Sequence, residues 1–247
     1  MRSFNINYNK ELGELSYSNK SVSPIGGDPS KYRRRDLNVI NIISQNDENE
    51  YISKDVLALA GVFYNGKGVW TVPVIIDSAG IPTTYDPNLS LTFKQPLQQY
   101  SCANIGLYSK KSKITTQVLF GGISANIYDQ NRDELIYDKN YGFTNQISAL
   151  TILPDNKCKY SFRQSYLGNF PHVPNGDSDK GILFGTNAHF FIAPNIPLLS
   201  YGVIDEDALV KCDVVIGHIY GGIGAEKPNY GKTVASPVIF EVVINCK

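Results

Sequence analysis

The chain has 247 residues, with 23 lysines and arginines against 23 aspartates and glutamates, so its formal net charge is zero. This balance removes the global attraction that draws basic proteins to nucleic acids and anionic membranes, and we expect neither as a partner. Apolar residues make up 42% of the chain, and its 21 glycines, 16 tyrosines and 11 phenylalanines favour an all-β protein built from strands and turns.

Residues 1–31 are polar and rich in Asn, Ser and Lys. We expect them to form an irregular N-terminal segment with one early strand, followed by a β-domain over residues 32–247. The segment has no apolar stretch of the kind that secretory signal peptides carry. Because a removed leader would leave the same sequence, the compartment stays open, and an extracellular or cell-surface location is among the alternatives.

From residue 32 onward, short apolar runs alternate with turn sequences. Strands are predicted over residues 36–43, 56–64, 68–76, 103–108, 114–123, 125–128, 135–137, 146–153, 159–165, 181–184, 189–192, 212–220 and 237–244. Asn65-Gly66 predicts a hairpin turn, because both central residues of a type I′ turn need positive φ. Residues 205–210 are the one place where a helical turn is expected. Residues 181–204 lack charged side chains, but their prolines favour buried strands over a membrane span.

A glycine pair recurs after a short apolar run, as Gly121-Gly122 and again as Gly221-Gly222. Weaker echoes occur at Gly61 and Gly185, and around residues 26–27. A strand that repeatedly ends in small residues indicates one supersecondary unit copied several times. We therefore assign a structural role to these glycines, namely Gly61, Gly121, Gly122, Gly185, Gly221 and Gly222.

The glycine pair, together with the Tyr-Asp pairs at Tyr128-Asp129 and Tyr137-Asp138, resembles the kelch repeat. Kelch repeats fold as blades of four antiparallel strands around a central channel, so the resemblance implies a β-propeller, here of about five blades. It also implies that residues 237–244 pair with N-terminal strands to close the ring. The chain departs from the kelch pattern because Trp70 is its only tryptophan, where kelch blades usually carry one each. It also resembles divergent bacterial propeller proteins, from which no activity is carried over.

Two other architectures remain open. The same strands fit a β-sandwich, or two small β-domains with a boundary near residues 168–180. The uneven spacing of the glycines also fits a chain that is part of a longer propeller, or one that a second copy completes, so a homo-oligomer is among the expected partners.

No motif for a zinc protease, a nucleophile elbow or a phosphate-binding loop occurs, and we assign neither catalytic residues nor a cofactor. Some kelch-type propellers hold copper, and Tyr100 lies close to Cys102. However, His189 and His218 alternate with apolar residues, which favours core or channel-lining histidines over metal ligands, so no metal is expected. The four cysteines, Cys102, Cys158, Cys212 and Cys246, allow three complete pairings. Their disulfide state stays open, with buried free thiols favoured.

The expected function is a non-catalytic binding or scaffolding propeller that recognises a protein partner or a glycan through its rim loops. The alternative is a carbohydrate-active hydrolase or lyase with acidic residues at the channel mouth, although the acidic cluster at residues 205–207 is more typical of a solvated turn. The basic run at residues 31–35 is interpreted as a salt-bridged start of a strand, with an anion contact as the alternative. Candidate binding residues are Arg33, Arg34, Arg35, Asp36, Tyr64, Asn65, Ser124, Glu226 and Lys227.

Aromatic residues in or near loops offer a second route to sugar binding. An exposed aromatic ring packs on the apolar face of a pyranose, while neighbouring Asn or Asp side chains bind its hydroxyls. The aromatic residues in such positions are Tyr64, Trp70, Tyr85, Tyr100, Tyr141 and Tyr166. The alternative is that these tyrosines fill half-buried strand positions.

Overall fold

The computed structural model describes residues 2–22, 28–45, 52–64, 68–154, 160–174, 181–209, 213–229 and 232–245. Its strands are β1 (Arg2–Asn9), β2 (Glu14–Val22), β3 (Val39–Gln45), β4 (Ile52–Ala58), β5 (Gly61–Tyr64), β6 (Gly68–Trp70), β7 (Val74–Ile76), β8 (Pro82–Thr84), β9 (Ala103–Ser109), β10 (Ile114–Phe120), β11 (Ile123–Asp129), β12 (Glu134–Phe143), β13 (Gln146–Pro154), β14 (Tyr160–Asn169), β15 (Leu183–Ile192), β16 (Ile204–Asp205), β17 (Val214–Ala225), β18 (Thr233–Ala235) and β19 (Phe240–Ile244). Three short 3-10 helices complete the list, η1 (Pro29–Tyr32), η2 (Ser200–Gly202) and η3 (Glu206–Ala208). The all-β class is therefore confirmed, and η3 lies where the helical turn was expected.

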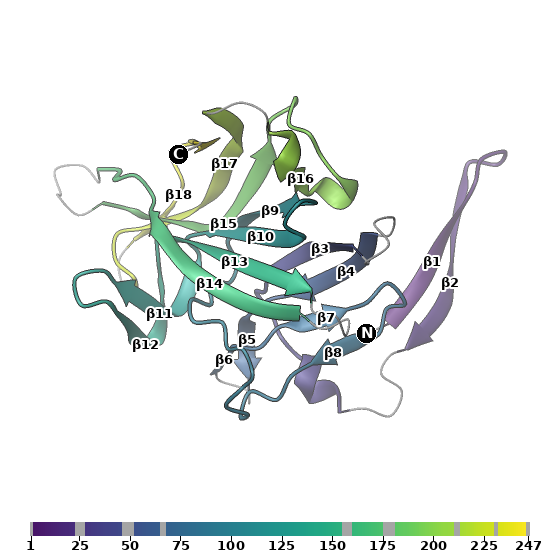
Figure 1. Ribbon diagram of the computed structural model, residues 1–247, viewed down its shortest axis with the longest axis horizontal. Coiled ribbons are helices and arrows are strands. Elements are labelled where there is room, and N and C mark those ends of the chain that lie inside the picture. Colours follow the sequence, from purple (N-terminus) through teal and green to yellow (C-terminus); the bar gives the residue numbers. More distant parts are fainter. Residues whose placement is uncertain are drawn as a thin grey trace.

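Three larger sheets make up the body of the protein (Figure 1). The first sheet has the strand order β3-β4-β7-β8 and the second β14-β13-β10-β9-β16, while the third is built on β15, β17, β18 and β19. The first and second sheets share one plan. Two antiparallel strands are followed by a separate hairpin, β5–β6 or β11–β12, and then by two more strands of the same sheet.

The core lies between the faces of successive sheets. Residues of the first sheet such as Ile42 and Leu57 pack against Leu119 and Leu150 of the second. The other face of the second sheet packs against the third through a larger cluster that includes Phe120 and Ile219. Alternate residues of each strand reach one face, so both faces of the second sheet are apolar and it forms the middle layer.

The same local geometry occurs at three glycines. The residue that follows each glycine forms an antiparallel β-pair with a distant residue: Val62 with Arg35, Ile123 with Tyr100, and Ile223 with Thr186. The residue next in sequence to each of these partners has a positive φ, which is 55° at Asp36, 56° at Ser101 and 56° at Asn187. A Cβ added at any of the three glycines would lie 2.6–2.7 Å from a carbonyl oxygen of the paired segment, which is that of Arg35 for Gly61, Tyr100 for Gly122 and Thr186 for Gly222. Only glycine fits these close backbone approaches.

Gly185 does not belong to this series. It lies within β15, where an added Cβ would stand 2.3 Å from the carbonyl oxygen of Phe120, and one added at Gly121 would stand 2.2 Å from that of Phe184. The two glycines therefore allow the end of β10 to cross β15 at backbone contact. Gly221 and Gly222 also differ from the expectation, because β17 runs through them instead of ending there.

Two predicted strands are each divided between two sheets. The predicted strand over residues 56–64 breaks into β4 and β5, because Gly61, the first residue of β5, has a φ of 130° that L side chains rarely adopt and that turns the chain out of the first sheet. Residues 68–76 likewise divide into β6 and β7 around Pro73, which has no backbone N–H to continue a ladder. Conversely, the two strands predicted over residues 181–192 form the single strand β15.

The expected ring closure by the C-terminal strand is wrong. β19 pairs antiparallel with β17 of its own sheet, not with N-terminal strands, so it completes the third sheet. The outer faces of the first and third sheets lie at the two ends of the stack (Figure 1).

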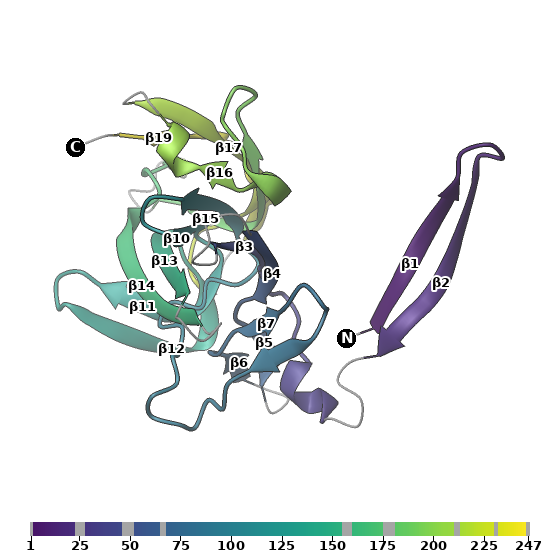
Figure 2. The same cartoon turned by 45° about the vertical axis from the view of Figure 1, so that its right-hand side comes forward.

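The N-terminal segment is more regular than expected. β1 and β2 form an antiparallel hairpin, closed by a turn in which the backbone N–H groups of Glu11 and Leu12 donate to the Asn9 side chain. The hairpin stands clear of the three sheets in both views (Figures 1 and 2).

Candidate functional site

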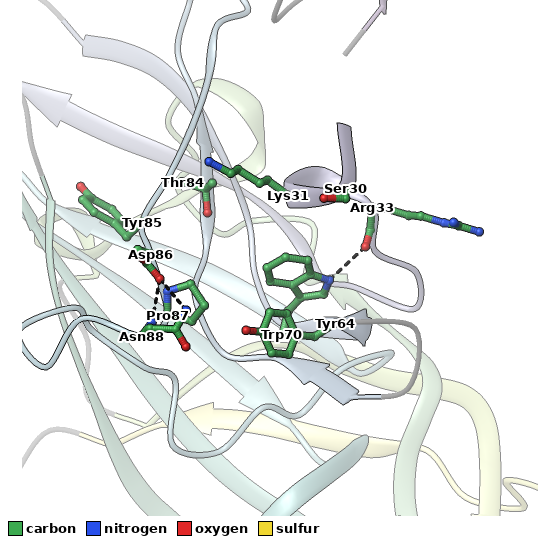
Figure 3. Close-up of a pocket in the computed structure, with 10 residues that line it drawn as sticks. All are labelled: Ser30, Lys31, Arg33, Tyr64, Trp70, Thr84, Tyr85, Asp86, Pro87 and Asn88. Carbon is green, nitrogen blue, oxygen red and sulfur yellow. Dashed lines mark hydrogen bonds between the residues drawn. The ribbon is translucent and has the colours of Figure 1, made fainter. Parts of the chain in front are cut away.

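A cavity of about 650 Å³ opens beside the first sheet, between η1, the β5–β6 hairpin and the loop after β8 (Figure 3). Its lining residues are Ser30, Lys31, Arg33, Tyr64, Trp70, Thr84, Tyr85, Asp86, Pro87 and Asn88. Two residues predicted as binding candidates, Arg33 and Tyr64, are among them, as are three of the six loop aromatics. The size is within the usual range for small-ligand pockets.

Local capping fixes both polar walls of the cavity. Asp28 accepts hydrogen bonds from the backbone N–H of Ser30 at 2.9 Å and from its hydroxyl at 2.7 Å, which starts η1. The Tyr32 hydroxyl then ties η1 to β8 by donating to the carbonyl of Pro82 at 3.4 Å. On the other wall, the Asp86 carboxylate accepts from the backbone N–H of Asn88 at 2.8 Å and holds the loop in a turn.

Trp70 forms the back of the cavity. Its side chain is only 6% exposed, and its indole N–H donates to the carbonyl of Arg33 at 3.0 Å. Tyr64 meets it edge to face, with 4.9 Å between the ring centroids, and the Arg34 guanidinium lies 4.6 Å from its centroid. The indole therefore exposes only a small apolar area to the cavity and mainly supports its back wall, and its one donor is already engaged.

Arg34 supports the cavity without facing it. Its guanidinium donates to the carbonyls of Leu59 and Val72 at 3.2 and 3.0 Å, and burial lowers its pKa to about 10. No described carboxylate pairs with it, so the salt bridge expected for the basic run forms only at Arg35, which contacts its neighbour Asp36 at 3.4 Å. That pair is exposed and contributes little to stability. Arg34 instead joins η1 and Trp70 to the first sheet.

The chemistry of the lining suits a ligand with both apolar and hydroxyl-bearing surfaces. Tyr64 and Tyr85 are half-buried and lie on different sides of the cavity (Figure 3). Lys31 and Asn88 are exposed polar groups at its rim, and the Arg33 side chain points away from the Trp70 ring (Figure 3). Asp86 is the one carboxylate among the described lining residues.

The other predicted binding residues lie elsewhere. Ser124 is fully buried, where its hydroxyl donates to the carbonyl of Asn126 at 2.6 Å, so it is no rim residue. Glu226 and Lys227 are exposed in the loop after β17, and the same loop is held against β12 by a hydrogen bond from Asn229 to Asp138 at 2.7 Å. Asn65 lies outside the described residues. These positions do not converge on the cavity.

Tyr100 and Cys102, the tyrosine and cysteine considered as possible copper ligands, are core residues. Tyr100 is 5% exposed, and burial raises its pKa well above the ordinary range. Cys102 is a free, buried thiol whose pKa burial raises to about 12. The other three cysteines lie outside the described residues. Within the part of the chain that the structure describes, no cluster of three or more His, Cys, Asp or Glu side chains forms a metal site.

The expectation that His189 and His218 lie in the core or line a channel is wrong. His189 is exposed and the His218 side chain is 45% exposed, 3.7 Å from the Glu241 carboxylate. They project from the outer face of the third sheet, because strand alternation places the apolar neighbours inward.

The acidic cluster at residues 205–207 has a structural role. Lys110 pairs with Asp205 at 2.9 Å, and Asp207 accepts from the backbone N–H of Lys111 at 3.0 Å and from the Ser109 hydroxyl at 3.1 Å. These contacts hold η3 against the turn between β9 and β10. The hydrogen bond from Lys111 is the main reason that the pKa of Asp207 is lowered.

No protein-family model matches the chain, and neither the curated proteins nor the solved structures give a match. The kelch resemblance therefore stays a prediction from the sequence pattern. Among the described residues, no helix has the length and apolar character to cross a membrane.

Proposed function

We propose that the chain is a non-catalytic binding protein whose cavity beside the first sheet holds a sugar unit of a glycan. The observation that carries the proposal is the convergence of Tyr64, Trp70 and Tyr85 with amide, hydroxyl and ammonium groups in one cavity of about 650 Å³. A pyranose has apolar C–H faces and equatorial hydroxyls, so it needs such a mixture of aromatic and polar contacts.

The polar groups at the rim support a neutral or acidic sugar. Asn88 supplies an amide oxygen and the one side-chain N–H that does not donate to Asp86, and Lys31 supplies a cation that makes no ion pair with any described residue. A carboxylate or sulfate on the sugar would find its charge partner in Lys31. The concave shape favours a small ring over a flat protein surface.

The same cavity gives less support to a hydrolase that cleaves glycosidic bonds. Glycosidases of the common type place two carboxyl groups on opposite sides of the scissile bond. The described lining holds Asp86 alone, and its carboxylate is engaged by the backbone and side-chain amides of Asn88 at 2.8 and 3.0 Å.

The test is a glycan array probed with the full chain and two variants. Tyr64→Ala removes a wall of the cavity, and we expect its affinity for any captured glycan to fall at least about ten-fold, which corresponds to about 1.4 kcal/mol. Tyr220→Ala removes a tyrosine of the third sheet that is 58% exposed and lies outside the cavity lining, and it serves as the matched control. Equal loss in both variants, or no binding by the wild type, would contradict the proposal.

We propose in addition that the first and second sheets are blades of a propeller-like array that is open at its ends. Their shared plan of two strands, a hairpin and two strands supports this, as do the matching geometries at Gly61, Gly122 and Gly222. In this arrangement the β5–β6 and β11–β12 hairpins occupy equivalent positions, and the cavity is built where the first of them meets η1.

A further inference from the structure

The N-terminal hairpin has one apolar face and one polar face. Residues that lie directly opposite each other in the β1–β2 ladder point to the same side of the hairpin. One side carries Phe4, Ile6, Tyr8, Leu15, Tyr17 and Asn19. The other side carries Asn5, Asn7, Asn9, Glu14, Ser16 and Ser18. From the Phe4–Asn19 pair to the Tyr8–Leu15 pair, this first side, called here the apolar face of the arm, contains no charged residue.

Nothing in the described chain covers this face. Its five apolar side chains are 58% to 74% exposed. The hairpin stands away from the three sheets in both views (Figures 1 and 2). A two-stranded hairpin without a further layer is marginally stable in water. An exposed row of two aliphatic and three aromatic side chains therefore requires a covering surface.

We propose that the apolar face of the arm packs against the same face of a second copy of the chain. A two-fold axis brings identical surfaces together, and five of the six residues of this face are apolar, so the occupant must match an uncharged and mainly apolar surface. The arm itself meets that requirement. Two arms stacked face to face form a small two-layer sandwich, with the hairpins about 10 Å apart and the Asn and Ser faces turned to water.

The size of the face agrees with a stable dimer. With about 150–250 Å² for each large aromatic side chain, the exposed fractions give the face on the order of 600 Å² of accessible surface. Two copies would then bury about 1,200 Å², which is the lower limit for stable protein–protein interfaces.

The register predicts which residues meet. Ile6 and Tyr17 are opposite each other in the middle of the face, and we place the two-fold axis beside them, between the two arms and at right angles to the strands. The Phe4 end of one arm then covers the Tyr8 end of the other. Ile6 of one copy consequently lies near Ile6 of the second copy, whereas Asn7 points away from the contact.

The first experiment measures the mass of the full chain in solution over a concentration series. We expect a dimer for the wild type and a monomer for the double variant Ile6→Asn and Tyr17→Asn. The control Asn7→Ser and Ser16→Asn changes the polar face of the same strands and should stay dimeric. Because the variants lie outside the three sheets, the thermal unfolding transition of the body should not change. A monomeric wild type, or a dimer that survives the Ile6 and Tyr17 changes, would overturn the proposal.

The second experiment separates arm-to-arm packing from docking of the arm on the body of another copy. Under mild oxidation, Ile6→Cys should form a covalent dimer, and Asn7→Cys and the wild type should not. If Ile6→Asn and Tyr17→Asn abolish the dimer but Ile6→Cys gives no covalent dimer, the arm docks elsewhere and the proposal is wrong. If glycan binding also holds, the dimer presents two cavities, and removing the arm should weaken binding to multivalent glycans but not to free sugars.

Discussion

At the scale of single residues, three glycines decide how the chain passes from one strand pair to the next. At Gly122 the backbone has a φ of 94°, and an added Cβ would lie 2.7 Å from both the Cβ of Cys102 and the carbonyl oxygen of Tyr100. Two separate constraints therefore exclude a side chain. One is the left-handed backbone, and the other is the lack of space beside a neighbouring segment.

These constraints are separable by mutation. Gly122→Ala adds a steric overlap with backbone to the conformational strain, and we expect it to lower the free energy of unfolding by more than about 3 kcal/mol. Gly221 has a φ of 74° but no heavy atom within 4 Å of an added Cβ. Gly221→Ala should therefore cost only the strain of about 1–2 kcal/mol. Urea unfolding of the two variants measures the difference, and equal losses would contradict the steric argument.

At the scale of elements, the sequence predicts one turn correctly but does not predict where two of the strands break. The Asn65-Gly66 signal correctly predicts that β5 and β6 pair, although the turn itself lies outside the described residues. The breaks at Gly61 and Pro73 were hidden, because the apolar pattern continues across them. In β1 the strict alternation of Phe4, Ile6 and Tyr8 with asparagines is a strand signal and agrees with the one early strand expected, but the polar composition of residues 1–31 concealed the second strand of the hairpin.

The contact between η3 and the β9–β10 turn makes stability depend on pH. The pKa of Asp207 is lowered from 3.8, so its carboxylate stabilises the folded state above that pH, and the stabilisation is lost as the pH falls through the lower folded value. Asp207→Asn should therefore be less stable than the wild type at neutral pH, with the difference shrinking in acid.

Urea unfolding midpoints across a pH series measure this effect. Asp213→Asn is the control, since Asp213 is exposed and already has the positive φ of 58° that asparagine tolerates. A gap between Asp207→Asn and the wild type that stays constant down to acid pH would show that the carboxylate charge does not stabilise the contact.

At the scale of the whole molecule, the sequence predicts the class and many strands but not the arrangement. Local patterns correctly predict strands at β9, β10, β13 and β14, which the structure pairs as the β9–β10 and β13–β14 hairpins. The expected ring depends on contacts between distant segments, and β19 in fact completes its own sheet. The cavity likewise depends on contacts between segments that are distant in the sequence. Arg33, Tyr64 and Tyr85 were all candidates, but only the folding of the first sheet brings them together, and it leaves Ser124 buried.

The most direct test of the account is a ligand titration followed by the fluorescence of Trp70. Trp70 is the only tryptophan of the chain and lines the cavity, so its emission reports on this cavity without a label. We expect glycans captured on the array to shift or quench this emission in a saturable way, and Asn88→Ala to raise the dissociation constant several-fold. Binding that is measurable by another method but leaves the Trp70 emission unchanged would place the ligand elsewhere and contradict the assignment of the cavity.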